Sequence, residues 1–196
     1  LPKCNSNKTV IFFHGGPAVQ TSGKFNPVIA TFISKGFRVI APNPAGSIGR
    51  GAAFAELDNG VKRIPKFEEE IIPFVQYIID NSIGPVFIHG GSYGGWIVNM
   101  LATSEIGEQI AAASTRNGLG SLTEFFVATS PWRIKHRSIE YLGHCSLCNH
   151  DIDEQLNCKR CKEIKISLSP FSNGGDLTIP QLIMFVGKRD SRVPWE

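Results

Sequence analysis

Ser92 is the residue whose surroundings most clearly indicate chemistry, because it is the serine of a G-x-S-x-G pattern at residues 90–94. An apolar segment suited to a buried strand, 85–89, precedes it, and an apolar segment suited to a helix, 96–102, follows it. The glycines let strand and helix approach closely and tolerate the strained backbone that pushes the serine outward. The pattern predicts a nucleophilic serine at a strand-to-helix turn, and the alternative is a glycine-rich turn with an incidental serine.

A second glycine-rich turn, HGGP at residues 14–17, follows the apolar segment 10–13. In acyl-transfer hydrolases such a loop supplies one backbone N–H to the oxyanion hole, and the residue after the nucleophile supplies the other. We therefore expect Gly16 and Tyr93 to donate these two N–H groups. His14 is expected to brace the loop by hydrogen bonding rather than to transfer protons.

Asp190 is the candidate acid, because it lies on a loop directly after the apolar segment 181–187. A carboxylate in that position orients the histidine that activates the serine. In hydrolases with a G-x-S-x-G serine, the chain order is serine, acid and then histidine. All the histidines of the chain precede Asp190: they are residues 14, 89, 136, 144 and 150. We expect the missing histidine to lie beyond Glu196 in a longer protein, so that these 196 residues alone are nearly inactive. The alternative is a hydrolase that has lost the ability to deprotonate Ser92.

A Cys-rich segment is expected as an insertion over residues 143–165. It contains C-x2-C, nine residues and C-x2-C again, formed by Cys145, Cys148, Cys158 and Cys161. Two such turns can point four thiolates inward and close a tetrahedral zinc site, in which His144 or His150 could replace one ligand. Disulfides and free cysteines are the alternatives, and the nine-residue gap is shorter than in common zinc ribbons. Any zinc here would be structural, and we expect no cofactor for catalysis.

Apolar segments that suit strands alternate with amphipathic segments that suit helices, which predicts a mostly parallel sheet with helices on both faces. The expected strands are 9–14, 37–42, 85–89, 109–114 and 181–187, and the expected helices are 26–35, 67–81 and 93–103. A stripe in the second helix indicates core packing: it comprises Phe67, Ile71, Phe74, Val75 and Ile78.

With these motifs in their order, the chain resembles the catalytic domain of the prolyl oligopeptidase family of serine peptidases, especially its acylaminoacyl-peptidase and dipeptidyl-peptidase branches. The matching segments are HGGP at 14–17, GGSYGGW at 90–96 and DSRVP at 190–194, and residues 39–51 are similar to the family's N-x-R-G-S-x-G-x-G loop. Ala45 stands where that loop normally has arginine, so one charged contact of the family is in question.

The resemblance implies an α/β-hydrolase fold over residues 1–196, incomplete at both ends, with a Ser-Asp-His triad. It also implies cleavage of short peptides or acylated amino acids, often behind an N-terminal β-propeller. A carboxylesterase on the same fold, and a catalytically dead hydrolase-like binding protein that uses its Cys-rich segment as a contact surface, are the alternatives.

Composition is typical of a soluble α/β domain, with 42% hydrophobic and 19% charged residues. The net charge is only +3 and no run of lysine or arginine is dense, so we expect no nucleic-acid partner. No apolar stretch approaches the ~20 residues that span a bilayer, so we expect no membrane segment. The first residues lack a signal-peptide pattern, and a cytoplasmic location is expected. The oligomeric state is not indicated.

Overall fold

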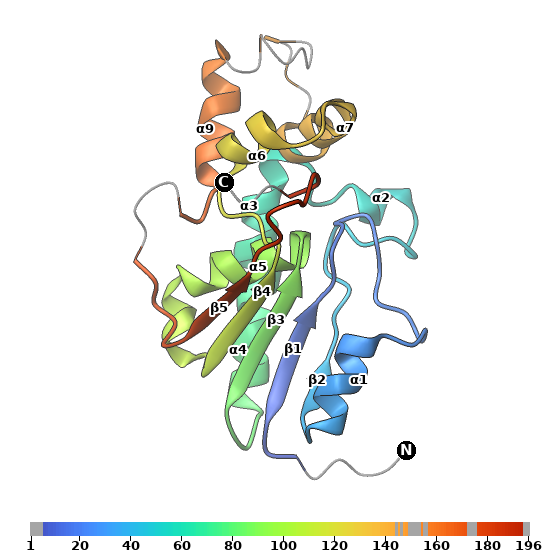
Figure 1. Ribbon diagram of the computed structural model, residues 1–196, viewed down its shortest axis with the longest axis vertical. Helices are drawn as coiled ribbons and strands as arrows, with labels where there is room; N and C mark the ends of the chain where they lie inside the picture. The colour runs from blue at the N-terminus through green and yellow to red at the C-terminus, as the bar shows by residue number, and fades with distance from the viewer. Residues whose placement is uncertain are drawn as a thin grey trace.

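A single sheet of parallel strands forms the centre of the molecule in the computed structural model, which describes residues 6–143, 145, 147–148, 154, 157–171 and 176–193. Its strand order is β2-β1-β3-β4-β5 (Figure 1). The strands are β1 Thr9–Phe13, β2 Arg38–Ile40, β3 Val86–Gly91, β4 Ala112–Arg116 and β5 Leu182–Phe185. Because all strands run the same way, their carboxyl ends meet at one edge, which is where open α/β sheets bind ligands.

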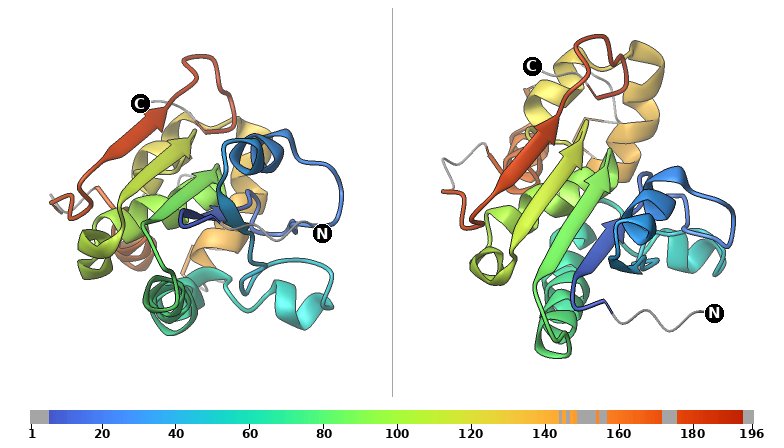
Figure 2. Two further views of the ribbon diagram at one scale, coloured as in Figure 1. Left: turned by 90° about the horizontal axis from the view of Figure 1, so that it is seen from below. Right: turned by 60° about the horizontal axis from the view of Figure 1, so that its bottom comes forward.

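Helices lie on both faces of the sheet, as the sequence predicts: α1 lies on one face, and α4 and α5 lie on the other (Figures 1 and 2). The helices are α1 Pro27–Ser34, α2 Ala52–Ala55, α3 Arg63–Lys66, α4 Ile72–Asp80, α5 Tyr93–Ala102, α6 Leu122–Ala128, α7 Pro131–Leu142 and α9 Lys159–Ser167. None of the described helices is long and apolar enough to cross a membrane.

The core lies between the sheet and the pair α4 and α5. All five residues of β1 are buried, and Val75 and Ile78 of α4 face inward together with most of α5. In contrast, α1 has no buried residue. Its start is nevertheless well defined, because the side chain of Asn26 accepts hydrogen bonds from the amides of Val28 and Ile29, and Pro27 suits the first turn.

Two predicted elements differ from the structure. The strand expected at 109–114 is wrong at its start: Glu105–Gln109 forms a 3-10 turn, and β4 begins only at Ala112. The apolar Ile110 that suggested an earlier start is fully buried in the connection instead. The helix expected at 67–81 belongs to a longer helical run that starts at Gly60 and contains a π-turn at Phe67–Ile71 before α4.

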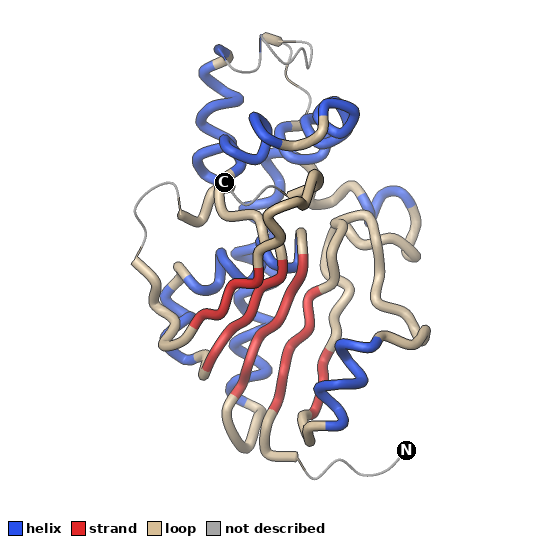
Figure 3. Tube along the Cα trace, in the orientation of Figure 1, coloured by secondary structure: helices blue, strands red, loops and turns tan. Residues whose placement is uncertain are grey.

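Helices α6, α7 and α9 gather beyond the carboxyl ends of the strands, and we call these three helices the helical cap (Figures 1 and 3). Two buried hydrogen bonds join the C-terminal end of α9 to its surroundings. The indole N–H of Trp96 in α5 donates to the carbonyl of Leu168 at 2.8 Å, and the amide of Leu122 donates to Ser169 Oγ at 2.7 Å. The cap is therefore tied to the helix that follows Ser92.

Candidate active site

Ser92 occupies the turn between β3 and α5 with backbone angles φ 54° and ψ −119°. A non-glycine residue rarely adopts a positive φ, and such strained residues cluster at active sites. Two backbone hydrogen bonds hold the turn: the amide of Ser92 donates to the carbonyl of Arg116 at 3.0 Å, and the amide of Trp96 donates to the carbonyl of Ser92 at 3.0 Å. Ser92 is half-buried and lines a pocket.

The glycine at position 94 is what lets this turn pack so tightly. A Cβ at Gly94 would overlap the carbonyl oxygen of Phe13, the last residue of β1. The first turn of α5 therefore crosses directly against the end of the neighbouring strand. The close approach explains why a bare backbone is needed on the C-terminal side of the nucleophile.

The loop after β1 lies against Ser92. A Cβ built on Gly15 would be 3.4 Å from Ser92 Cβ, so backbone atoms of the loop border the nucleophile. Gly16 has a φ of 135°, which favours glycine. Tyr93 is the first residue of α5, and the first amides of a helix have no partner within it. The sequence assigns the oxyanion hole to Gly16 and Tyr93: Gly16 follows the glycine that borders Ser92, and Tyr93 is the next residue after Ser92.

His14 braces the loop after β1. Its Nδ1–H donates to the carbonyl of Gly15 at 2.7 Å, which leaves Nε2 to accept from the hydroxyl of Ser47 at 3.0 Å. The neutral ring satisfies both contacts. Burial lowers the pKa of His14 below its ordinary value of 6.5, although the bond to Gly15 opposes the shift.

Asp190 is held in a fixed orientation on the loop after β5. One carboxylate oxygen accepts from the amides of Arg192 and Val193 at 2.8 and 3.1 Å, and the other accepts from the side-chain amide of Asn117. Asn117 stands at the end of β4 with φ 47°, and its Oδ1 accepts from the amide of Gly187 at 2.8 Å. Sequence reasoning did not identify Asn117, because no motif marks it.

Ser92 and Asp190 line the same pocket, whose volume is about 630 Å³. Gly15, from the loop after β1, also lines it. Its apolar wall includes Phe12, Val19, Phe25, Val28 and Phe185, and its cationic groups are Lys24, Arg116 and Arg192. The pocket thus joins the predicted nucleophile, the predicted acid and an apolar surface at the carboxyl edge of the sheet.

The side chain of Tyr93 points away from this pocket into a buried polar network that sequence reasoning missed. Its hydroxyl donates to Asp58 Oδ2 at 2.7 Å, and the guanidinium of Arg63 lies 3.4 Å from the same oxygen. Burial raises the pKa of Tyr93 well above its ordinary value, so the phenol stays protonated.

A small cavity beside Ala45 is lined by Asp58 and Arg63, so a buried cation is present next to the position where the family has arginine.

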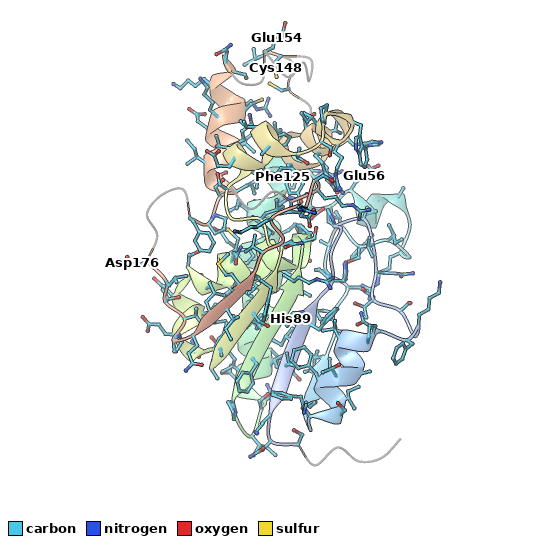
Figure 4. The ribbon with its side chains drawn as sticks, in the orientation of Figure 1. Glu56, His89, Phe125, Cys148, Glu154 and Asp176 are labelled. Carbon is cyan, nitrogen blue, oxygen red and sulfur yellow. The ribbon has the colours of Figure 1, made fainter. Side chains whose placement is uncertain are left out.

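No described histidine hydrogen-bonds to Ser92 or Asp190. His14 is engaged by Gly15 and Ser47, and His89 pairs through Nδ1 with Ser114 Oγ at 2.7 Å on the sheet (Figure 4). Burial, followed by the charge of Arg116, lowers the pKa of His89. His136 is exposed on α7, and His144 and His150 lie outside the described residues.

The candidate metal ligands come together far from the pocket. Cys145, Cys148, Cys158 and Cys161 place their sulfur atoms within 4.8 Å of one another. They lie at the outer end of the helical cap, where Figure 4 labels Cys148. None of them lines the pocket of Ser92.

Comparison with solved structures shows that this chain has an α/β-hydrolase fold, because it superposes on peptidases of that fold. Pyrococcus horikoshii acylaminoacyl peptidase superposes with a TM-score of 0.75 and 20% identity, covering 100% of this chain and 29% of that chain. A Mycobacterium tuberculosis puromycin-hydrolyzing peptidase superposes with a TM-score of 0.73 and 26% identity, covering 98% of this chain and 27% of that one.

The model of the Prolyl oligopeptidase family matches residues 24–196, and the chain belongs to this family. Probable dipeptidyl-peptidase 5 of Emericella nidulans is 30% identical over 125 residues, which are 59% of this chain and 17% of that protein. Dipeptidyl peptidase family member 6 of Caenorhabditis elegans is 30% identical over 92 residues, which are 45% of this chain and 12% of that protein. The chain thus spans less than a fifth of the length of these curated relatives.

Proposed function

We propose that this chain is the catalytic part of a serine peptidase in which Ser92 is acylated by the substrate. The observation that carries the proposal is the positive φ of Ser92 at a strand-to-helix turn that opens into the pocket shared with Asp190. A strained turn of this kind presents the serine oxygen at the top of a parallel sheet. Membership of the prolyl oligopeptidase family supports a peptidase rather than an unrelated hydrolase.

In the proposed reaction, Ser92 Oγ attacks the carbonyl carbon of the scissile bond while a histidine accepts its proton. Asp190, already held by amides of Arg192 and Val193, orients that histidine and stabilises its charged form. The amides of Gly16 and Tyr93 stabilise the negative charge that develops on the substrate oxygen. The histidine then protonates the leaving amine, and water releases the acyl group. We place the histidine after Asp190, following the chain order of this fold.

The preferred substrates in this proposal are short peptides or acylated amino acids. The apolar wall of the pocket, which includes Phe25, Val28 and Phe185, suits an apolar acyl group or side chain. An esterase would use the same nucleophile, so the two activities differ in the leaving group. Amides of acylated amino acids and p-nitrophenyl esters, assayed side by side, distinguish them.

Covalent labelling by a fluorophosphonate probe tests the nucleophile. We expect Ser92→Ala to abolish labelling of the full-length protein, because no other described serine sits at such a turn. Ser22→Ala is the matched control: Ser22 lines the same pocket but is exposed on a loop, and its loss should leave labelling unchanged. Persistent labelling of the Ser92→Ala variant would end the proposal.

A further inference from the structure

Four cysteine side chains converge at the outer end of the helical cap from two separate segments. Cys145 and Cys148 follow the end of α7, whereas Cys158 is the residue before α9 and Cys161 lies in its first turn. Cys145, Cys148 and Cys161 are at least 97% buried, and Cys158 is half-buried. The cluster therefore forms an enclosed site and not a group of surface thiols.

The distances between the sulfur atoms match a tetrahedral metal site. Cys145 Sγ lies 3.7 Å from Cys158 Sγ, and Cys148 Sγ lies 3.5 Å from Cys161 Sγ. All four sulfurs lie within 4.8 Å of one another. Zinc binds thiolates at about 2.3 Å, and a tetrahedron of that size places its sulfurs about 3.8 Å apart. Each close pair joins one cysteine of the first C-x2-C turn to one of the second.

The charge next to the cluster also suits a zinc tetrathiolate. Four thiolates around Zn²⁺ carry a net negative charge, and a buried charge needs a partner. Lys165 lies one helical turn after Cys161 and is only 4% exposed, with its ammonium 5.2 Å from the ring of Phe126. Among the described residues, Lys165 has no carboxylate partner in an ion pair.

We propose that Cys145, Cys148, Cys158 and Cys161 bind one Zn²⁺ ion that joins the end of α7 to the start of α9. Four protein ligands leave no open position for water or substrate, so the site is structural. Neither the family match nor the proposed peptidase activity requires this metal. It is a second, independent site of the molecule.

The position of the site defines what the metal does. The other end of α9 is already held, because Trp96 donates to Leu168 and Leu122 donates to Ser169. Zinc would fix the start of α9, so that both ends of the helix are anchored. Loss of zinc should therefore loosen α7 and α9 and leave the buried strands β1 and β3 intact.

Metal analysis of the protein purified under reducing conditions without chelators tests the proposal. We expect one zinc per chain by elemental analysis and by native mass spectrometry. Replacement with Co²⁺ should give the intense visible and near-ultraviolet absorption of a tetrahedral tetrathiolate site. If the purified protein neither contains zinc nor gives this spectrum after Co²⁺ is added, the proposal fails. A metal-free chain whose mass is four hydrogens lower would indicate two disulfides instead.

Cysteine variants test the ligands. Cys161→Ser should lower the zinc content at least tenfold, while the matched control Cys4→Ser should retain one zinc per chain.

Because Cys161→Ser could lose zinc by failing to fold, hydrogen exchange on the unmodified protein, with and without a chelator, provides a second measurement. We expect faster exchange in α7 and α9 and unchanged exchange in β1 and β3 after zinc removal. Equal zinc contents in the two variants, or uniform acceleration of exchange, would contradict the proposal. Fluorophosphonate labelling of Ser92 in the same samples reports separately on the proposed peptidase.

Discussion

The two clusters of reactive side chains in this molecule are positioned in different ways. At the carboxyl edge of the sheet, Ser92 is fixed mainly by backbone: parallel strands, a hydrogen bond to Arg116 and the close contact at Gly94. At the outer end of the helical cap, the four cysteines meet through their sulfur atoms, with Cys145 and Cys148 after the end of α7 and Cys158 and Cys161 at the start of α9. A site held by close backbone contacts can be recognised in the sequence by short glycine-rich motifs. A site held by side chains can be recognised only by the types and spacing of its residues.

Arg63 connects α7 of the helical cap to the helix that begins directly after Ser92. Its guanidinium donates to the carbonyl of Glu140 in α7 at 3.0 Å and lies 4.4 Å from the ring of Tyr141. On its other side it pairs with Asp58 and lies 4.9 Å from the ring of Tyr93, the residue after the nucleophile. The residue is 1% exposed, so the connection runs through the interior.

Arg63→Met should break this connection and produce the largest loss of stability among the substitutions considered below. The variant leaves Asp58 buried without its cation, and breaking a buried pair in this way costs about 3–5 kcal/mol. We expect the free energy of unfolding, measured by urea denaturation, to fall by that amount.

The matched control is Arg50→Met. Arg50 is exposed and its guanidinium lies 5.1 Å from the ring of Phe54, so its loss should cost less than about 1 kcal/mol. A double variant with Asp58→Asn should be more stable than the sum of the single losses implies, because the orphaned charge is removed. Equal effects of Arg63→Met and Arg50→Met would show that Arg63 does not connect the cap to the sheet.

A change at the edge of the sheet should affect catalysis more than folding. Asn117→Gly removes the amide that holds Asp190 and suits the positive φ at this position. A hydrogen bond to a charged group contributes about 1.5–3 kcal/mol, so we expect the rate of acylation to fall roughly 10- to 100-fold. The rate is measured by following fluorophosphonate labelling over time. The KM for substrate, measured separately, should change little.

Asn117 is a positioning residue in this interpretation, so its effect should depend on Asp190. Asp190→Asn should lower the rate further than Asn117→Gly does. Combining the two substitutions should then give no further loss beyond Asp190→Asn. Additive losses from the two substitutions would argue that Asn117 acts independently of the carboxylate.

The sequence predicted the sheet edge well because its geometry is enforced locally. The apolar runs before residues 14, 90 and 188 correspond to β1, β3 and β5, and the predicted start of α5 at Tyr93 is confirmed. The prolyl oligopeptidase resemblance is confirmed by the family match. The roles of Ser92, Asp190, Gly16 and Tyr93 stay predictions, although the first two share one pocket.

The remaining features depend on contacts between distant segments. β4 has the sequence Ala-Ala-Ser-Thr-Arg, which contains few large apolar residues. It forms a strand because it pairs with β3 and β5 on either side. Arg63 meets Tyr93 and Glu140 only after folding, and a charged residue in sequence predicts a solvated surface. Asn117 likewise has no motif around it. Helix α9 escaped prediction because its sequence, KRCKEIKIS, is mostly polar.

The smallest expected effect tests the oxyanion loop by pH. Burial lowers the pKa of His14, so the folded protein resists protonation of a ring that the unfolded chain protonates near pH 6.5. Stability from the neutral ring is therefore complete above about pH 6.5 and falls as the pH decreases toward the folded-state pKa. His89 shifts in the same direction. His14→Gln should reduce the slope of unfolding free energy against pH between about pH 7 and 5, measured by urea denaturation in the presence of a constant zinc concentration.

His136→Gln, at an exposed position, should leave the slope unchanged. A slope that His14→Gln does not alter would mean that the loop beside Ser92 tolerates a charged ring, and that the backbone alone fixes this edge.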